Sequence, residues 1–344
     1  MPGILVFGDI NIDLLAHYDA EPAWGLDNLV GELVQQCGGV GANVAVALAQ
    51  WGIGARLAGS VGTDAFGERA LNFLATRNVD LKLVKRTSRA PTGLIFIAVR
   101  PGGQRTIFGS RGANAEFRLD RDAISFDDVA GVHLVGYNFL SPGGEEAAEF
   151  LLEEAHRRGA WVALDPGMAP CQYIPEKIVQ VAERVDYLIV VLGEAMALYG
   201  HPELSAALAR MKACHTCGPR EVVVKRGERG SLIYDAGSWR EVPTFAVESR
   251  DTTGSGDAFA AAYLRARMND WPHTEAALVG NAAGAAAATT PGASESMPEP
   301  HQVLRLVASS TLAAPWEAVR QRVHERLKVE FGRAEGKASG SSEN

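Results

Sequence analysis

Short apolar runs alternate with longer stretches of helical character along most of this chain. The runs at 4–7 and 55–61 are apolar almost throughout, which is typical of strands that are buried on both faces. The stretches at 44–51 and 64–78 repeat small and apolar residues with the period of a helix. Later in the chain we expect strands at 132–136, 161–165, 187–191 and 221–225, and helices at 145–158, 203–212, 258–267 and 275–289. This order predicts an α/β fold in which helices flank a mostly parallel central sheet.

Two stretches interrupt the alternation with shorter, strand-like patterns. Residues 94–100 and 105–109 are expected to be strands joined by Pro101-Gly102-Gly103-Gln104, a composition typical of a hairpin turn. Residues 17–36 have a strand-like pattern with no helical period. We therefore predict a small β lid, made of 14–36 and 93–114, and a main domain made of 1–13, 37–92 and 115–330. A second hairpin is expected within the main domain, at 231–242.

Composition narrows the class of protein. The chain has 344 residues, 47% of them hydrophobic, and a net charge of −8. The acidic balance argues against nucleic acid as a partner. No apolar run reaches the ~18 residues needed to span a bilayer, and the first residues lead into a strand rather than a signal peptide. We therefore expect a cytoplasmic protein without a membrane partner, and a disordered tail at 331–344, which is rich in Gly, Ser and charge.

The cysteines give little sign of special chemistry. Cys37, Cys171, Cys214 and Cys217 are too few for a disulfide scaffold in a chain of this length. Cys214 and Cys217 have C-x-x-C spacing, but no second pair of zinc ligands lies near them in the sequence. Reduced thiols are the better interpretation.

The strongest chemical signal is the run Asp251-Thr252-Thr253-Gly254-Ser255-Gly256-Asp257-Ala258-Phe259, directly before an expected helix. The first N–H groups and the dipole of a helix form a site for negative charge. Gly254, Ser255 and Gly256 leave these amides open to a phosphoryl group whose charge grows during transfer. Asp257, on the first turn, can reach a substrate hydroxyl as a general base. For an isolated G-x-G-D, a simple turn with a helix-start acid is an equal alternative, but the full run is far less common by chance.

A second polar group follows the first strand. Asn11 and Asp13 alternate along an extended segment, so they point to one side, where an amide and a carboxylate can hold vicinal hydroxyls. Capping or turn residues are the alternative. The glycine-rich run from Cys37 to Asn43 precedes a helix, which suggests close approach of the backbone to a ligand, and Asn43 can bind a polyol. A dinucleotide fingerprint would need glycine at Val44, and no segment matches a P-loop.

Two further polar residues are open to two interpretations. Arg111, in Arg111-Gly112-Ala113-Asn114, is a candidate for contact with a polar end of the substrate, although a surface arginine is the more common explanation. Asn281 is the only strongly polar side chain in the middle of the expected helix at 275–289. It is a candidate purine contact, and local hydrogen bonding is the equal alternative.

These residues resemble those of the ribokinase-like sugar kinases, also called the PfkB carbohydrate kinase family. Two motifs carry the resemblance, residues 38–43 and residues 251–259, and the layout is similar over about 3–310. The resemblance implies a ribokinase-like three-layer α/β/α sandwich with a small β-sheet lid. It also implies transfer of the γ-phosphate of ATP to a sugar hydroxymethyl group, with Mg²⁺ as a further cofactor.

The resemblance also assigns roles to individual positions. It implies that Asp257 is the catalytic base and that Gly254, Ser255 and Gly256 line the anion hole. The sugar site of the family falls at Asn11, Asp13, Gly39, Gly41 and Asn43; the nucleotide phosphates fall at Lys225, Gly227 and Gly230, and the adenine at Asn281. The site at which many relatives use a monovalent cation such as potassium (K⁺) falls at Asp251, Thr253, Gly292 and Ser296.

The chain departs from the family pattern at two places. The family often carries Asn-x-x-Glu near magnesium, whereas this chain has Val191-Leu192-Gly193-Glu194. Glu194 therefore keeps its implied place near magnesium, through water, without the asparagine. Ribokinases place a glutamate on the sugar near residue 137, where this chain has Tyr137 and Asn138, so the resemblance does not imply ribose as the substrate.

The sequence leaves alternatives to a sugar kinase. A nucleoside kinase of the same fold, acting at the 5′ position, would be favoured by an aromatic wall such as Phe108 or Tyr137. A non-catalytic regulator that binds sugar or nucleotide is suggested by the missing asparagine, although the intact Asp257 argues against it. We expect a small-molecule acceptor, ATP and a homodimer joined through the lid, because an exposed small sheet has edges that need covering.

Overall fold

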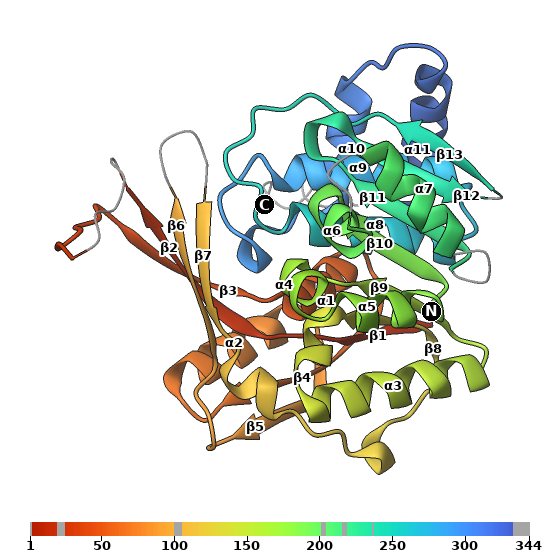
Figure 1. Ribbon diagram of the computed structural model, residues 1–344. Helices are drawn as coiled ribbons and strands as arrows, with labels where there is room; N and C mark the ends of the chain where they lie inside the picture. The colour runs from red at the N-terminus through yellow and green to blue at the C-terminus, as the bar shows by residue number, and fades with distance from the viewer. Residues whose placement is uncertain are drawn as a thin grey trace, which may run out of the picture.

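The computed structural model describes residues 2–18, 25–99, 105–200, 204–214, 219–235 and 237–332. Within these residues the large sheet has the strand order β13-β12-β11-β10-β9-β8-β1-β4-β5 (Figure 1). The strands are β1 (Gly3–Phe7), β4 (Ala55–Gly62), β5 (Asp80–Thr87), β8 (Val129–Val135), β9 (Trp161–Asp165), β10 (Tyr187–Val191), β11 (Glu221–Lys225), β12 (Ser231–Asp235) and β13 (Ser238–Val242). All neighbours from β11 to β5 are parallel, and the hairpin β12–β13 adds an antiparallel edge.

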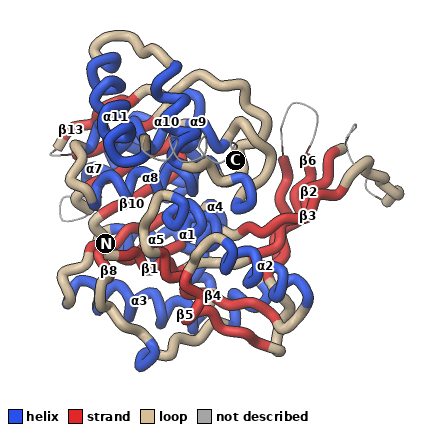
Figure 2. Tube along the Cα trace, turned by 180° about the vertical axis from the view of Figure 1, so that it is seen from behind, coloured by secondary structure: helices blue, strands red, loops and turns tan. Residues whose placement is uncertain are grey.

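Helices cover both faces of this sheet (Figures 1 and 2). One face packs against α1 (Val40–Gln50), α2 (Ala65–Thr76), α8 (Ser255–Met268), α9 (His273–Ala287), α10 (Pro300–Ser309) and α11 (Trp316–Phe331). The other packs against α3 (Pro142–Arg157), α4 (Met168–Tyr173), α5 (Pro175–Ala182), α6 (Leu192–Leu198) and α7 (Leu204–Cys214). Alternate residues of β1 divide between the layers: Ile4 and Val6 join the first core, and Leu5 and Phe7 the second. The expected three-layer arrangement is therefore confirmed.

The alanine-rich helices α8 and α9 pack closely because their facing residues are small. A Cβ atom added at Gly280 of α9 would lie only 2.9 Å from the ring of Phe259 on α8. The close packing of α9 against α8 holds α8 in place. The N-terminus of α8 points at the carboxyl ends of the parallel strands, where it lies beside Lys225 at the end of β11.

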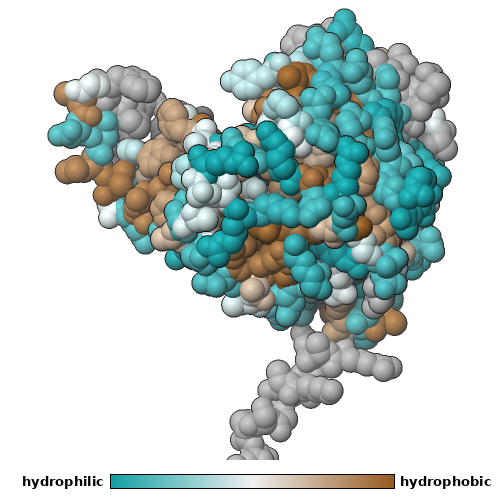
Figure 3. All heavy atoms as spheres, turned by 90° about the horizontal axis from the view of Figure 1, so that it is seen from below, coloured by the Kyte–Doolittle hydropathy of each residue, from teal (hydrophilic) through white to brown (hydrophobic). Residues whose placement is uncertain are grey.

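A separate small sheet has the order β3-β2-β6-β7 and stands away from the main body (Figure 1). It contains β2 (Asn11–His17), β3 (Leu33–Gly38), β6 (Gly93–Val99) and β7 (Arg105–Ser110). In the antiparallel pair β2–β3, Asp13 lies opposite Gln36. Seen from below, the projecting arm carries brown, hydrophobic residues (Figure 3). The sheet reaches further toward the main body than the predicted lid segments, because Asn11 already pairs with Gly38.

Several element bounds differ from the expected ones for physical reasons. The helix expected at 64–78 begins after Asp64, whose carboxylate accepts the N–H of Gly67 at 2.8 Å as an N-cap. The sequence pattern does not predict β5, because an edge strand need not be apolar and this one mixes lysine and arginine with leucine and valine. Phe331, expected in the disordered tail, ends α11.

Some expectations fall outside the described residues. These are the turn at 101–104, most of the Cys214–Cys217 motif and the tail from 333 onward. Of the cysteines, Cys37 and Cys171 are buried and free, as expected. None of the described helices combines the length and apolar character that a membrane crossing requires.

Candidate active site

The polar side chains predicted from the sequence gather where the parallel strands end. Gly254, the N-cap residue of α8, has φ 76°, a left-handed conformation that glycine adopts without strain. The N–H of Ser255 donates to Thr252 O at 3.2 Å, and that of Asp257 donates to Gly254 O at 3.0 Å. The N–H of Gly256 has no acceptor within the described part of the chain, so this amide is the most open of the three.

Asp257 is held by a residue of α1, a helix that is distant in the sequence but adjacent in the fold. Asn43, on the first turn of α1, donates from Nδ2 to Asp257 Oδ2 at 2.6 Å. The hydroxyl of Ser294 donates to Asn43 Oδ1, which fixes the orientation of the amide. Burial raises the pKa of Asp257 to about 7, and repulsion from Asp165 adds to this, whereas the hydrogen bond from Asn43 opposes it. The carboxyl group is therefore poised to exchange a proton near neutral pH.

The predicted acceptor residues lie on the small sheet beside this aspartate. Asn11 accepts a hydrogen bond at Oδ1 from Asn114 Nδ2, at 2.9 Å, and this fixes its amide. Asp13 is buried, and its Oδ1 has no partner within the described residues. Burial raises the pKa of Asp13 to about 7, with a contribution from the negative charge of Asp251. Both side chains are thus placed to meet hydroxyl groups of a ligand.

The glycines of the early motif let two segments meet. Gly39 precedes α1 at φ 94°, and a Cβ atom there would overlap the carbonyl oxygen of Asp9. A Cβ atom at Gly41 would overlap the backbone of Gly8 at 2.6–2.8 Å. The motif therefore brings the start of α1, with Asn43, against the carboxyl end of β1.

Arg111 has a partner that the sequence does not suggest. Its Nε donates to Asp9 Oδ2 at 3.1 Å and its Nη2 to Asp9 Oδ1 at 2.7 Å, so the ion pair is bidentate. Arg111 is thus neither a free surface arginine nor a free cation of the site.

Charged residues also gather at the ends of β9, β10 and β11. Lys225 donates from Nζ to Asp165 Oδ2 at 2.9 Å, and a Cβ atom on Gly256 would lie 3.2 Å from the same Nζ. The ammonium group therefore stands beside the start of α8. Glu194 accepts the N–H of Val191 at 2.8 Å. Burial raises the pKa of Glu194 to about 8, and repulsion from Asp165 contributes.

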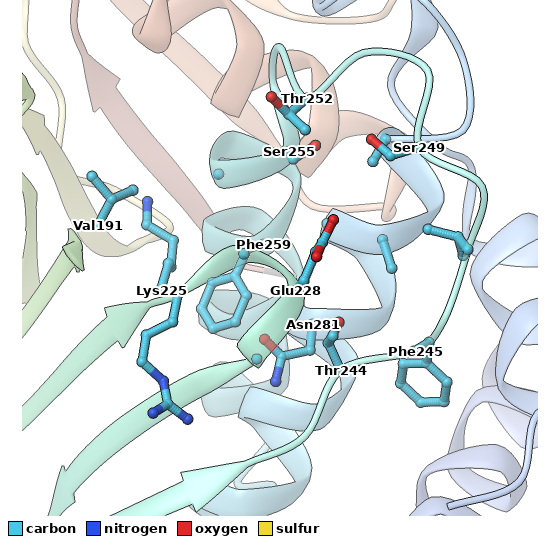
Figure 4. Close-up of a pocket in the computed structure, with 18 of the residues that line it drawn as sticks. Val191, Lys225, Glu228, Thr244, Phe245, Ser249, Thr252, Ser255, Phe259 and Asn281 are labelled. Carbon is cyan, nitrogen blue, oxygen red and sulfur yellow. The ribbon is translucent and has the colours of Figure 1, made fainter. Parts of the chain in front are cut away.

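A cavity of about 930 Å³ opens beside these charges. Lys225, Gly227 and Gly230, the positions predicted for the nucleotide phosphates, line it. Figure 4 shows Lys225 and Val191 on one side of the cavity and Phe245 on the other. Asn281 also lines the cavity, but its Nδ2 donates to Ser231 Oγ at 3.1 Å, to Val242 O at 3.3 Å and to Pro243 O at 2.9 Å. Its amide nitrogen thus binds the β12–β13 hairpin and the residue after it, which agrees with the alternative that Asn281 makes local hydrogen bonds.

The four positions implied for a monovalent cation lie in two adjoining loops. Asp251 accepts at Oδ1 from the N–H of Thr253, at 2.9 Å, and from its hydroxyl, at 2.7 Å. At Oδ2 it accepts the N–H of Gly292 at 2.9 Å. Ser296 donates to Pro291 O at 2.6 Å. The carboxylate of Asp251 therefore joins the loop before α8 to the loop after α9.

Sequence reasoning did not identify several residues of the site. These are Asp9, Gln36, Asn114, Asp165 and Ser294. Asp165 ends an expected strand and Asn114 belongs to a segment already noted, and these were the available signals. The other three are single residues whose roles depend on contacts made only in the fold.

Comparison with known proteins identifies the family. Residues 1–300 match the pfkB family carbohydrate kinases. Ribokinase of Haemophilus influenzae is 28% identical over 312 residues, which cover 88% of this chain and 98% of the relative. Fructokinase-1 of Oryza sativa subsp. japonica is 29% identical over 293 residues, covering 80% and 90%. The 2-dehydro-3-deoxygluconokinase of Escherichia coli is 30% identical over 239 residues, covering 64% and 76%.

Solved structures agree with this match. Ribokinase from Thermotoga maritima has a TM-score of 0.75 at 29% identity, covering 90% of this chain and 100% of the other. Arabidopsis thaliana ribokinase, complexed with ribose and ATP, has a TM-score of 0.78 at 26% identity, covering 90% and 99%. The expected ribokinase-like fold is confirmed. The chain therefore belongs to the pfkB family of carbohydrate kinases, phosphotransferases that act on an alcohol group.

Proposed function

We propose that this protein is an ATP-dependent carbohydrate kinase that transfers the γ-phosphate to a sugar hydroxymethyl group. The observation that carries the proposal is the position of Asp257. It stands at the N-terminus of α8, is held by Asn43 at 2.6 Å and lies between the polar residues of the small sheet and the nucleotide cavity. The ribokinase and fructokinase relatives support a sugar as the acceptor.

Asp257 acts as the general base in this mechanism. Its carboxylate accepts the proton of the attacking hydroxyl, and Asn43 keeps the accepting oxygen in place. The pKa of about 7 lets the group hold a proton briefly and return it to solvent. Asn11 and Asp13 orient the sugar by hydrogen bonds to its other hydroxyls. Gly39 and Gly41 allow the close backbone approach that this arrangement needs.

The amides at the start of α8 stabilise charge on the transferred group. Gly254, Ser255 and Gly256 form the turn that presents these amides, and the open N–H of Gly256 is the donor for the negative charge that develops. Lys225, whose ammonium lies beside Gly256, adds a positive charge there once it is released from Asp165. Gly227 and Gly230 allow the neighbouring loop to follow the nucleotide phosphates, and Asn281 borders the adenine end.

The cofactors fit the residues that are present. The cavity of about 930 Å³ can accommodate a nucleotide, and Arabidopsis ribokinase is known with ATP. Among the described residues no group of three or more His, Cys, Asp or Glu side chains could hold a metal directly. Glu194 and Asp165, two buried carboxylates at adjacent strand ends, would instead hold Mg²⁺ through water. When bound, ATP supplies the phosphoryl group and Mg²⁺ offsets the charge of its phosphates.

We also propose a monovalent-cation site, for K⁺, at Asp251, Thr253, Gly292 and Ser296. Its support is the carboxylate of Asp251, which joins the loop before α8 to the loop after α9. A cation there would stiffen the loop that presents the anion hole. Dependence of turnover on K⁺, lost in Asp251→Asn, is the measurement that checks it.

The proposed homodimer through the lid rests on exposed apolar residues of the small sheet. Leu33 on β3 and Ile107 and Phe108 on β7 are exposed, and these strands form the two edges of the sheet. The mass in solution, measured by light scattering, tests this proposal, and Phe108→Ser should shift it toward the monomer. We likewise propose that the chain is divided into a main domain and a lid.

A nucleoside kinase is the second candidate. Its support is Tyr137, a half-buried aromatic ring packed on Gly167. Burial raises the pKa of Tyr137, and the nearby negative charges of Glu194, Asp9 and Asp165 raise it further. The ring therefore lies near these carboxylates, which border the acceptor region. The regulator without catalysis has no such support, because the family is one of phosphotransferases and the pair Asp257–Asn43 is intact.

The deciding experiment is an ADP-release assay of the purified protein with ATP, Mg²⁺ and K⁺ against sugars and nucleosides. We expect turnover with a sugar, and a fall of roughly 10²- to 10⁴-fold in kcat in Asp257→Asn, the range of general-base contributions. The matched control is Asp270→Asn, at an exposed position with φ 55° that asparagine tolerates. Near-normal turnover of Asp257→Asn would contradict the base assignment, and turnover with nucleosides alone would favour the second candidate.

A further inference from the structure

The ion pair of Arg111 and Asp9 determines the charge at the acceptor side of the site. Two nitrogens of one edge of the guanidinium contact the two oxygens of Asp9, at 3.1 and 2.7 Å. This ion pair occupies the Nε–Nη2 edge, one of the two edges through which a guanidinium binds a carboxylate with two hydrogen bonds; among the described residues Nη1 makes no hydrogen bond. Asp9 is only 5% exposed, so water does not compete with Arg111 for its carboxylate. The positive charge of Arg111 is therefore already neutralised inside the protein.

This ion pair adjoins the residues that face the acceptor. The amide nitrogen of Asn114 donates both to Asn11 Oδ1, at 2.9 Å, and to Arg111 O, at 3.0 Å. The carbonyl oxygen of Asp9 lies directly against Gly39, where it leaves no room for a Cβ atom. The ion pair therefore lies between the segment of Asn11 and the segment of Gly39, the two segments proposed to face the sugar.

The other charges near the acceptor are also unfavourable to an anion. Asp13 and Asp257 are buried carboxyl groups, and each adds negative charge when it ionises. In the described part of the chain, the basic side chains around the site already face carboxylates. Lys225 pairs with Asp165 at 2.9 Å and Arg69 with Glu295 at 3.1 Å. A carboxylate on the acceptor would find repulsion and no cation in excess.

The polar atoms without partners suit neutral hydroxyl groups instead. Among the described residues, Asp13 Oδ1, Gln36 Nε2 and Arg111 Nη1 are buried and make no hydrogen bond. Asp13 and Gln36 lie directly opposite each other in β2 and β3, so an acceptor and a donor stand side by side. A hydroxyl group both donates and accepts, and can satisfy such a pair.

We propose that the acceptor is an uncharged polyol and that Asp9 excludes sugar acids by neutralising the positive charge of Arg111. Gln36 joins Asp13 in binding a hydroxyl group of this polyol. The inference rests on the proposed kinase function and specifies its substrate class. It makes Asp9 a specificity-determining residue, although no sequence motif of the site contains it.

The test compares neutral sugars with a sugar acid in two assays. ADP release is measured with D-ribose, D-fructose and 2-keto-3-deoxygluconate, and the same compounds are tested for raising the thermal melting temperature. The wild-type protein should favour the neutral sugars in both assays. Asp9→Asn keeps the shape and leaves Arg111 charged, so the kcat/KM ratio of the sugar acid to the best neutral sugar should rise roughly tenfold or more.

A double variant provides the control. In Asp9→Asn with Arg111→Gln both charges are absent, so the gain toward the sugar acid should disappear. Should Asp9→Asn not fold, Asp9→Ser provides a second removal of the charge. A wild-type preference for the sugar acid, an unchanged ratio in Asp9→Asn, or no stabilisation by any neutral sugar would overturn the inference. Stabilisation by neutral sugars without any ADP release would instead refute the proposed function and leave the inference in place.

Discussion

Two clusters of buried charge lie at opposite ends of the strand β11 and are built in opposite ways. At the start, Glu221 accepts hydrogen bonds from Arg267, with Arg267 Nη2 at 2.7 Å, and from the hydroxyl of Tyr263. Burial alone would raise its pKa, but these bonds hold the pKa below the usual range. Beyond the other end, near Lys225, Glu194 is similarly buried, yet its pKa is raised to about 8. One glutamate is compensated, and the other is not.

The difference separates the work of folding from the work of catalysis. Removing a buried carboxylate that has a full set of donors destabilises the native state, because its partners are left buried without an acceptor. A buried carboxylate that faces Asp165 with too few donors raises the energy of the empty protein, and a cation or proton can relieve this. The charges at the N-terminal end of β11 are therefore compensated by other residues of the chain, whereas the carboxylates beyond its carboxyl end are not.

The largest effect on stability is expected from Glu221→Gln. Arg267 and Tyr263 would remain buried around a neutral amide, and the loss of a paired buried charge costs roughly 3–5 kcal/mol of unfolding free energy. Urea unfolding followed by circular dichroism measures it. The kcat of the folded variant should stay close to that of the wild type, because a five-residue strand separates the site by about 13 Å. Unchanged stability would show that the cluster at Glu221 does not hold the fold.

The same contrast explains what the sequence could predict. The start of α8, with Gly254 and Asp257, is a local motif, and a helix N-terminus has the same anion chemistry in any fold. Asn43 and Asp257 were both expected, but their bond joins residues 214 positions apart, and no pattern gives that pairing. The compensated cluster at Glu221 was not anticipated at all, because glutamate at the start of a strand has no local signature.

Partners across the fold explain the remaining gaps. Arg111 was a sound candidate, yet its meaning changes with Asp9, whose carboxylate comes from a segment 102 positions earlier. Asn281 was ambiguous because its three acceptors lie in and after the β12–β13 hairpin. Periodicity predicts the layers and the positions of most strands, since these depend on burial. It does not predict which polar groups meet at a strand end.

Glu194→Gln should behave in the opposite way to Glu221→Gln. Removing an uncompensated charge should leave the unfolding free energy unchanged or raise it by about 1 kcal/mol near pH 8. The kcat with saturating sugar should fall roughly 10- to 100-fold, because the proposed water-mediated contact of Glu194 with Mg²⁺ would be weakened. Melting temperature and ADP release, measured on the same preparations, check both halves. A variant that loses stability and keeps its activity would reverse the comparison.

The pH dependence of stability follows from the same raised pKa values. When the pKa of a group is higher in the folded protein than in the unfolded chain, the group contributes most to the free energy of unfolding at low pH. This contribution is lost as the pH rises through the pKa of the folded state. With Asp13 and Asp257 at about 7 and Glu194 at about 8, the wild-type melting temperature should fall from pH 6.5 to pH 8.5. In Glu194→Gln the fall should be smaller. His133, with its pKa lowered to about 4, stays neutral over this range in the folded protein.

The smallest effect is expected at Glu275, which tests whether burial of the acid or burial of its partners decides the energy. Glu275 is 3% exposed, like Glu221, but its partners on α11 reach into water: Arg322, at 2.7 Å, has a side chain 55% exposed, and Arg326, at 2.8 Å, one 42% exposed. Water can solvate these guanidinium groups after the acid is removed, so Glu275→Gln should cost only about 1 kcal/mol. A cost equal to that of Glu221→Gln would show that burial of the acid alone sets the energy. A cost near zero would mean that α11 is held by packing, such as Phe331 on Trp51, and not by charge.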